Sequence, residues 1–338
     1  MATIYDIAKR ANVSPMTVSR VINNTGNTKQ ETRNKVEAAI KELNYIPNSA
    51  ARSLTLKKSK ILMLLIPDIT NPFFTKLARG AEDKARQAGY KILLSNTDEN
   101  ADKEAEYIKS LISTGVDGVI FTPANDTSSK NLKLLTRHRI PYVLTDRLVE
   151  NIQADAVLGD NFFGMKQLLQ HLTDHQHKNI ALVNGPADVY TARERKKAFT
   201  EVMKLHQLND HHMYEMTFTS GSDAKKVVNQ LQTLDDVNRP TAIIAGNNFI
   251  AVNLIKELRS KNVNVPKDMS LVCFDDLEQA SEIDPFLTAV KQPAYDFGYI
   301  SAQFLIERIE QSAPPSPREV VLKSELVVRK STKKRSRG

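Results

Sequence analysis

Apolar positions in residues 4–45 recur at the spacing of α-helices, and no stretch there alternates as a strand would. A first helix is predicted by four apolar residues that share one helical face: Ile4, Ile7, Ala8 and Ala11. Ser14 is suited to cap a second helix that begins at Pro15. A third helix is expected over about residues 29–43. Two short helices separated by a tight turn and closed by a third predict an all-α helix-turn-helix domain over residues 1–46.

From residue 61 the pattern changes, and short apolar runs alternate with longer amphipathic stretches of helical periodicity. The apolar runs cover residues 61–66, 91–95, 118–122, 141–145, 156–158, 180–184, 241–245 and 270–274. This alternation indicates βαβ units and mostly parallel sheets. The runs are too many for one sheet of ordinary width. We therefore expect an α/β body of two doubly wound parallel-sheet lobes over residues 61–328, with residues 146–160 as the crossover between them.

Residues 47–60 join the helical head to this body. They combine small residues with Lys57, Lys58 and Lys60. A helix of this length is marginal in water when it stands alone. The sequence therefore predicts a hinge that becomes ordered only on a partner.

Charge is divided unevenly along the 338 residues, although the formal net charge is only +8. Residues 1–60 hold eleven Lys and Arg against four acids, whereas residues 61–328 hold 30 bases and 35 acids. Residues 329–338 hold six bases and no acid, which predicts a disordered basic tail. A basic head on a slightly acidic body indicates that the head binds a polyanion and that the body has a separate task.

No basic-then-apolar signal peptide begins the chain, and the longest apolar run is far too short to cross a bilayer. We therefore expect a cytoplasmic protein without a membrane partner. The single cysteine, Cys273, lies within an apolar run and is expected to be a strand core residue.

Two stretches of the head carry a resemblance to a known family. They are Thr3-Ile-Tyr-Asp-Ile-Ala-Lys-Arg-Ala-Asn-Val-Ser-Pro-Met-Thr-Val-Ser-Arg-Val-Ile-Asn23, and Leu43-Asn-Tyr-Ile-Pro-Asn48 followed by Ala51-Arg-Ser-Leu54. Both resemble the lactose/galactose repressor family of bacterial transcription regulators. The body is similar to the family's sugar-binding core and to periplasmic ribose-binding proteins. The resemblance implies a homodimeric repressor that binds palindromic operator DNA under the control of a sugar.

The second predicted helix supplies the expected DNA contacts. A recognition helix enters the major groove with its first turns against the base edges, so Met16, Thr17 and Arg20 are expected at the bases. Pro15 can add an apolar contact. Residues with donors suited to phosphate are Tyr5, Ser14, Ser19 and Asn23. The alternative is a plain surface helix of a small bundle.

In the family, a leucine at the place of Leu54 wedges into the minor groove and kinks the DNA. The positive charge of Arg52 and of the following lysines favours that role here, with Arg52 a further DNA contact. The alternative for Leu54 is a small core contact against the body.

In the body, a set of polar and aromatic residues follows the ends of the apolar runs, where ligands bind in doubly wound sheets. These residues correspond one by one to those of ribose-type binding proteins: Asn71, Phe73, Phe74, Asp146, Arg147, Arg195, Phe218, Asn247, Asp275 and Gln292. Each alone has a structural alternative, such as a core ring, a turn residue or a surface ion pair. Asn248 departs from the family pattern, in which an acid is more usual.

The chemistry of this set suits a free sugar. Carboxylates accept from hydroxyls, guanidinium groups donate in a fork, amides do both, and phenylalanine rings cover C–H faces. Two aspartates against two arginines favour a neutral monosaccharide over a sugar phosphate or purine. The Asp-Arg pair together with Gln292 favours a pentose such as ribose over a disaccharide.

Three other functions are alternatives to a sugar-controlled repressor. A transport-type sugar-binding protein would explain the body but not the basic head. A regulator that answers to a phosphorylated protein partner is a further alternative. An enzyme is not expected, because no phosphate-binding glycine loop or nucleophile elbow occurs. No cofactor and no metal are expected, since a helix end at a turn explains His171, His175 and His177 better than a metal site.

Overall fold

The computed structural model describes residues 2–23, 25–45, 59–208, 211–216, 222–277 and 286–335. The chain divides into two compact units, residues 1–59 and residues 60–338. Within the described residues, no helix combines the length and apolar character needed to cross a membrane.

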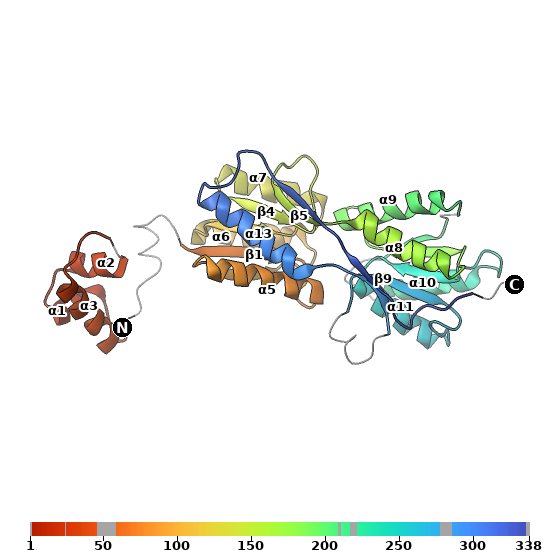
Figure 1. The fold of residues 1–338 in the computed structure, drawn as a ribbon, viewed down its shortest axis with the longest axis horizontal. Coiled ribbons are helices and arrows are strands. Elements are labelled where there is room, and N and C mark those ends of the chain that lie inside the picture. Colours follow the sequence, from red (N-terminus) through yellow and green to blue (C-terminus); the bar gives the residue numbers. More distant parts are fainter. Residues whose placement is uncertain are drawn as a thin grey trace. The chain divides into compact units, whose positions relative to one another are not determined.

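The first unit is a bundle of three helices, as the apolar spacing predicted (Figure 1). They are α1 (Ile4–Ala11), α2 (Pro15–Asn23) and α3 (Gln30–Glu42). Thr3 and Asp6 form a reciprocal capping box at the start of α1, and Ser14 Oγ accepts from the Thr17 amide at the start of α2. The buried core is small and entirely apolar: Ile7, Ala8, Ala11, Val18, Val21, Val36 and Ala39.

The second unit consists of two α/β lobes, which confirms the predicted fold class (Figure 1). The first lobe has a six-stranded sheet in the order β11-β5-β4-β3-β1-β2, with every neighbouring pair parallel. Its strands are β1 (Ile61–Ile66), β2 (Lys91–Asn96), β3 (Gly118–Phe121), β4 (Tyr142–Thr145), β5 (Asp155–Gly159) and β11 (Glu319–Leu322). Helices α5 (Pro72–Gln87) and α13 (Ala294–Ile309) cover one face, and α6 (Ala101–Thr114) and α7 (Ser129–Arg137) cover the other.

The second lobe repeats this plan with the strand order β12-β10-β9-β8-β6-β7. Its strands are β6 (Ile180–Asn184), β7 (Met213–Glu215), β8 (Ala242–Ala245), β9 (Ser270–Phe274), β10 (Thr288–Lys291) and β12 (Glu325–Val327). Helices α8 (Asn161–Asp174) and α9 (Tyr190–Leu205) pack on one face, and α10 (Ser222–Thr233) and α11 (Asn248–Ser260) on the other. Cys273 is a buried core residue of β9, as expected, and β10 with β12 is the one antiparallel pair among the described strands.

The chain passes between the lobes three times, not once. The first passage follows β5, so the predicted crossover region contains a strand of the first lobe and ends where α8 begins. The second follows β10 and delivers α13 back to the first lobe, and the third separates β11 from β12. The carboxyl ends of the strands in both sheets therefore meet at a junction that these three connections cross. The cavity between the lobes lies at this junction.

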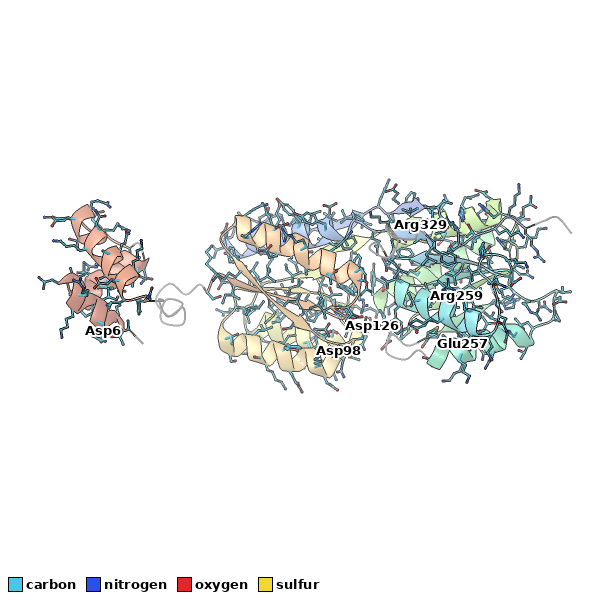
Figure 2. All side chains as sticks on the ribbon, turned by 90° about the horizontal axis from the view of Figure 1, so that it is seen from below. Asp6, Asp98, Asp126, Glu257, Arg259 and Arg329 are labelled. Carbon is cyan, nitrogen blue, oxygen red and sulfur yellow. The ribbon has the colours of Figure 1, made fainter. Side chains whose placement is uncertain are left out.

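The prediction of a disordered tail is wrong for residues 329–335. Arg329 donates from both terminal nitrogens to the Asp276 carboxylate at 2.7 Å, on the second lobe (Figure 2). The Ser331 hydroxyl donates to the Leu271 carbonyl and accepts from the Thr288 amide. Buried partners from strands β9 and β10 thus order a segment whose composition alone suggested a solvated tail.

Candidate functional site

Helix α2 of the first unit presents one face to the core and one to solvent. Val18 and Val21 are buried, whereas the Met16 side chain is 65% exposed and the Arg20 guanidinium lies 3.7 Å from its sulfur. An exposed methionine beside an arginine for which the described residues supply no acidic partner is unusual on a surface that serves only stability. This face offers one apolar group and one fork of donors to a base edge.

The remaining predicted DNA contacts lie around this face. Tyr5 is 70% exposed on α1, and Pro15 is exposed at the start of α2. The Ser14 and Thr17 hydroxyls are 3.0 Å apart, and Asn23 donates to the Ser19 hydroxyl at 3.2 Å. Arg52 and Leu54 lie outside the described residues, so their proposed roles stay predictions.

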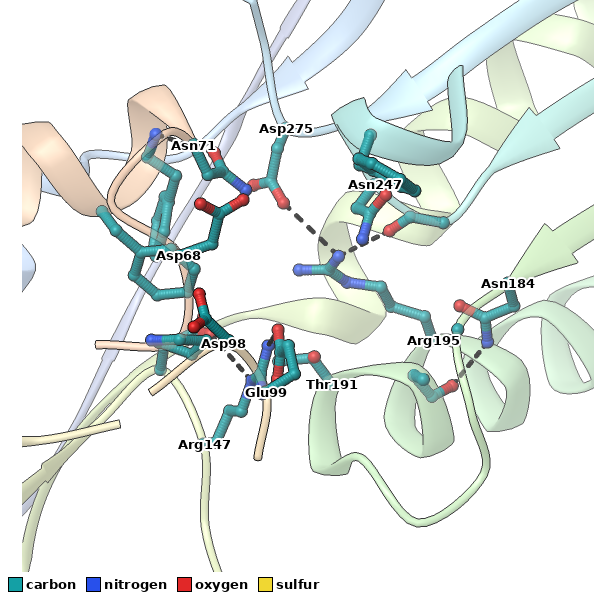
Figure 3. A pocket seen from close by; sticks show the side chains of 18 residues that line it. Asp68, Asn71, Asp98, Glu99, Arg147, Asn184, Thr191, Arg195, Asn247 and Asp275 are labelled. Atoms are coloured by element: carbon teal, nitrogen blue, oxygen red, sulfur yellow. Dashed lines mark hydrogen bonds and ion pairs between the residues drawn. The ribbon is translucent and has the colours of Figure 1, made fainter. Parts of the chain in front are cut away.

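A cavity of about 190 Å³ lies between the two lobes of the second unit (Figure 3). A single water needs only roughly 10–15 Å³, so this space suits a small organic molecule. Eight of the ten predicted residues line it: Asn71, Phe73, Phe74, Asp146, Arg147, Arg195, Asn247 and Asp275. Phe218 lies outside the described residues. Gln292 does not line the cavity, because its side chain is directed to Asp275.

The two aspartates occupy equivalent places in the two lobes. Asp146 follows β4 and Asp275 follows β9, and these strands hold the same position in their sheets. Both residues have left-handed backbone conformations, with φ of 66° and 71°. Such a conformation costs energy for a residue other than glycine, and aspartate is among the residues that tolerate it best. The turn that follows each strand thereby places a carboxylate at the cavity.

Asp146 is a buried carboxylate that no described hydrogen-bond donor reaches. Its nearest cation is Arg147, whose Nε lies 3.6 Å from Oδ2. Burial raises the pKa of Asp146 to about 6, although the charges of Arg147 and Arg195 act to lower it. A carboxylate that is buried without donors is ready to accept hydrogen bonds from a ligand.

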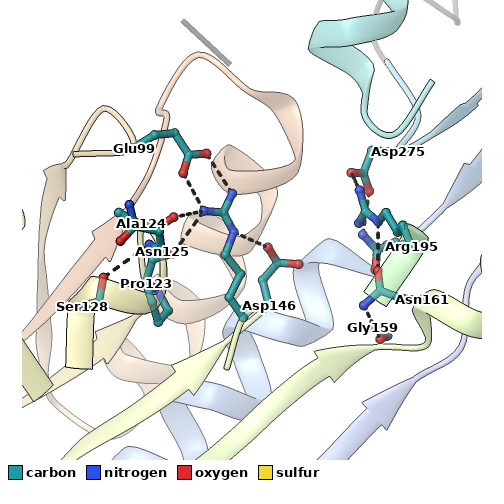
Figure 4. Close-up of polar contacts among 12 residues, drawn as sticks. Glu99, Pro123, Ala124, Asn125, Ser128, Asp146, Gly159, Asn161, Arg195 and Asp275 are labelled. Atoms are coloured by element: carbon teal, nitrogen blue, oxygen red, sulfur yellow. Dashed lines mark hydrogen bonds and ion pairs between the residues drawn. The ribbon is translucent and has the colours of Figure 1, made fainter. Parts of the chain in front are cut away.

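Arg147 is committed to groups of its own lobe, of which Glu99, Pro123 and Ala124 are labelled in Figure 4. Its Nη1 and Nη2 donate to the two oxygens of Glu99 at 2.6 and 2.8 Å, and Nη1 also donates to the carbonyls of Pro123 and Ala124. Burial alone would lower the pKa of Arg147, but the charge and hydrogen bonds of Glu99 outweigh it and raise that pKa. The buried Nε has no hydrogen-bond partner in the described structure.

Arg195, from α9, has different partners. Its Nε donates to the Asn161 side chain at 2.9 Å, and its Nη1 donates to the Gly246 carbonyl at 2.6 Å and reaches Asp275 at 3.5 Å. The guanidinium also stacks 3.7 Å above the ring of Phe274. Nη2 donates to no described residue, so this nitrogen is available to a ligand.

Apolar and amide groups complete the cavity. The rings of Phe73 and Phe74 meet edge to face with centroids 5.1 Å apart. Asn71 and Asn247 cap helices α5 and α11 through their side chains. Asn71 also exchanges two hydrogen bonds with Asn248, at 3.2 and 2.9 Å, which joins the first lobe to the second. Asn248 therefore has a specific partner at the place where the family pattern has an acid.

Sequence reasoning missed part of the lining. The additional residues include Asp68, Asp98, Glu99, Asn184, Thr191 and Phe249. Several of them follow or end a strand of one of the sheets, so the rule that nominated Asp146 and Asp275 could have found them. Nothing in the sequence links Glu99 to Arg147, which is 48 residues away. Within the described residues, no group of three or more His, Cys, Asp or Glu side chains is placed to hold a metal ion.

Comparison with known proteins identifies the kind of chain to which these features belong. Residues 3–48 match the family described as bacterial regulatory proteins, lacI family, and residues 169–332 match the periplasmic binding protein-like domain. The ribose operon repressor of Bacillus subtilis (strain 168) is 35% identical over 334 residues, which cover 99% of each chain.

Solved structures agree with this match. The lac repressor dimer bound to operator and the anti-inducer ONPF has a TM-score of 0.83 and 26% identity, over 98% of this chain and 99% of that one. A LacI family transcriptional regulator from Enterococcus faecium with bound ribose has a TM-score of 0.70 and 28% identity, over 82% of this chain and all of that one. The chain belongs to the lacI family of bacterial regulatory proteins, which are DNA-binding transcription regulators.

Proposed function

We propose that this protein is a repressor of pentose-utilisation genes that binds operator DNA through residues 1–46 and D-ribose in the cavity between its lobes. One observation carries the proposal: a ribose-sized cavity in a chain with a lacI-family head is lined by carboxylates and a guanidinium that lack full sets of partners. The role is regulatory and gives the cavity no catalytic task. The protein would act in the cytoplasm, where bacterial operators lie.

The polar lining supports a neutral polyol as the effector. Asp146 and Asp275 can each accept from sugar hydroxyls, and Arg195 Nη2 can donate to a hydroxyl or ring oxygen. Phe73 and Phe74 offer apolar surface to the C–H faces. A relative named for the ribose operon and a structural neighbour with bound ribose favour this pentose over other monosaccharides.

The exposed face of α2 supports operator binding. Arg20 would donate to a guanine, and Met16 would contact a thymine methyl. Tyr5, Ser14, Ser19 and Asn23 would contact phosphates, and Leu54 with Arg52 would act in the minor groove. A homodimer on a palindromic site would place two such heads at two half-sites, in line with the dimeric state of the lac repressor neighbour.

Ribose would control DNA binding by a shift between two states of the body. A ligand held by both lobes binds better to the arrangement in which the lobes approach each other. Because linkage is reciprocal, operator DNA would change the affinity for ribose by the same factor.

The test combines calorimetric titration with an operator gel shift. We expect the full-length protein to bind D-ribose more tightly than D-arabinose, D-xylose or D-glucose, and ribose to change operator affinity. Arg20→Ala should abolish specific operator binding without affecting ribose binding, whereas Arg137→Ala on exposed α7 should change neither. A protein for which no sugar alters operator affinity would contradict the proposal.

A further inference from the structure

We propose that Glu99 determines the specificity of the cavity for uncharged sugars, because it occupies the fork of Arg147 with which an anionic sugar would otherwise pair. The inference rests on the proposed function and assigns a role to a side chain that does not itself need to touch ribose. It is carried by the contacts of Arg147 and by the charges that surround the cavity.

The first step is the saturation of Arg147. An arginine binds a phosphate or carboxylate best through two parallel N–H donors of its planar fork. Here Glu99 takes one donor from each terminal nitrogen, and two backbone carbonyls share Nη1. The side chains of Arg147 and Glu99 are only 6% and 16% exposed, so solvent does not loosen this pair. The remaining nitrogen, Nε, is buried and faces Asp146 Oδ2 at 3.6 Å.

The second step is the excess of negative charge. Five carboxylates line the cavity, from Asp68, Asp98, Glu99, Asp146 and Asp275. Only Arg147 and Arg195 oppose them among the described lining residues. Like charges repel strongly in a partly buried site, because screening by water is weak there. Hydroxyl groups bring no charge and are accepted by the same carboxylates.

The third step is the state of the other arginine. Arg195 gives Nη1 to a carbonyl and to Asp275, and gives Nε to Asn161. Its Nη2 donates to no described residue and can donate to one hydroxyl of a ligand. Because Nε and Nη1 already have partners, Arg195 cannot offer two adjacent nitrogens to a phosphate. Glu99 is therefore the group whose removal would free a fork, since its two oxygens hold both terminal nitrogens of Arg147. This makes it a specificity residue that acts through Arg147.

The test measures the affinity ratio of D-ribose to D-ribose 5-phosphate by competition calorimetry on the full-length protein. Wild-type protein should bind ribose and discriminate strongly against the phosphate. Glu99→Gln removes one negative charge and loosens Arg147, so this ratio should fall by about tenfold or more. Asp102→Asn is the matched control, because it makes a similar charge change at an exposed position outside the cavity lining and should leave the ratio within twofold.

A double variant, Glu99→Gln with Arg147→Met, separates charge from structural damage. It removes the pair together and leaves the net charge of the lining unchanged, so it should still reject the phosphate. It also keeps the test informative if Glu99→Gln alone does not fold, since deleting both partners of a buried ion pair is tolerated better than deleting one. An unchanged ratio in Glu99→Gln, or equal gains in the single and double variants, would overturn the inference. Wild-type protein that binds neither sugar would instead overturn the proposed effector.

Discussion

The two lobes present the same pair of groups to the cavity but hold them in different ways. In the first lobe Arg147 lies between two carboxylates, those of Glu99 and Asp146. In the second lobe Arg195 is held by an amide, a backbone carbonyl and one carboxylate, that of Asp275. The strand positions and the backbone conformations of the two aspartates are alike, so the difference lies in the partners and not in the fold.

Because of this difference, the two lobes offer different hydrogen-bonding groups to a sugar. In the first lobe Glu99 occupies both terminal nitrogens of Arg147, and no described donor reaches the Asp146 carboxylate. In the second lobe Arg195 Nη2 donates to no described residue, while the Asp275 carboxylate already accepts from Gln292 at 2.6 Å. We therefore expect the first lobe to offer mainly an acceptor to the sugar and the second lobe mainly a donor.

The largest effect should follow from Arg147→Ala. This change leaves the buried Asp146 and the half-buried Glu99 without their cation, and breaking a buried ion pair in this way costs about 3–5 kcal/mol of the free energy of unfolding. Arg195→Ala should cost less, because Asp275 keeps its hydrogen bond from Gln292. Urea unfolding of both variants, monitored by circular dichroism, measures the two losses.

Arg137→Ala, on the exposed surface of α7, serves as the control and should change stability by no more than about 0.5 kcal/mol. Equal losses for Arg147→Ala and Arg195→Ala would show that the two arginines play equivalent structural parts. The division between the lobes would then have no energetic basis.

Ribose affinity should depend more on Arg195 than on Arg147, which is the reverse of their order for stability. Arg195→Met removes the free donor, and a hydrogen bond to a charged group contributes about 1.5–3 kcal/mol, so affinity should fall by roughly 10- to 150-fold. Calorimetric titration measures this loss. Lys197→Ala, exposed on the same helix, should leave the affinity unchanged. An Arg195→Met variant that binds ribose as tightly as wild type would remove the donor role of the second lobe.

The sequence predicted the two aspartates of the cavity, but not the partners that hold the two arginines. Asp146 and Asp275 were predictable because the carboxyl end of a parallel strand is a ligand position, and the structure brings both to the cavity. Gln292 also follows a strand, but strand position does not tell whether a side chain points to the ligand or to a neighbour. Glu99 follows β2 in a polar loop where acids are commonplace, and only the three-dimensional fold brings it to Arg147.

The same limit applies to the fold. Alternating apolar runs predicted the parallel sheets, whereas the short strands β7, β10, β11 and β12 lack a strong pattern of their own. The composition of residues 329–338 predicted disorder because it counts charge but not partners. Arg329 becomes ordered through Asp276, 53 residues earlier in the chain, and such a pairing has no local signal.

A smaller effect is expected from pH and should arise in the first lobe. Burial raises the pKa of Asp146 to about 6, and sugar hydroxyls donate to the ionised form. Ribose affinity should therefore be constant above pH 7 and weaken as the pH falls through 6, by at most about tenfold per unit. Titrations between pH 5 and pH 8 without DNA measure this dependence.

Asp146→Asn should bind ribose with an affinity that no longer changes across this range. Asp275→Asn should bind more weakly at every pH and keep the decline. A decline that survives in Asp146→Asn would assign the titrating group to another part of the cavity.

The smallest effect should come from the amide pair of Asn71 and Asn248, which is one of the contacts that join the lobes. Asn71 Oδ1 already accepts from the Phe73 amide at 3.0 Å, so the Asn71 side chain cannot turn over without losing its helix cap. Asn248→Asp would therefore replace the donor that faces Oδ1 by a second acceptor, while the bond from Asn71 Nδ2 remains possible. Loss of one such bond costs about 0.5–1.5 kcal/mol, which corresponds to a roughly two- to twelvefold loss of ribose affinity. Asn262→Asp, exposed beyond the end of α11, makes the same charge change away from the cavity. It should leave the ribose affinity measured by calorimetric titration unchanged. Unaltered affinity in Asn248→Asp would mean that ribose binding does not depend on this link, beside which the ion pair of Asp126 with Arg193 also joins the lobes.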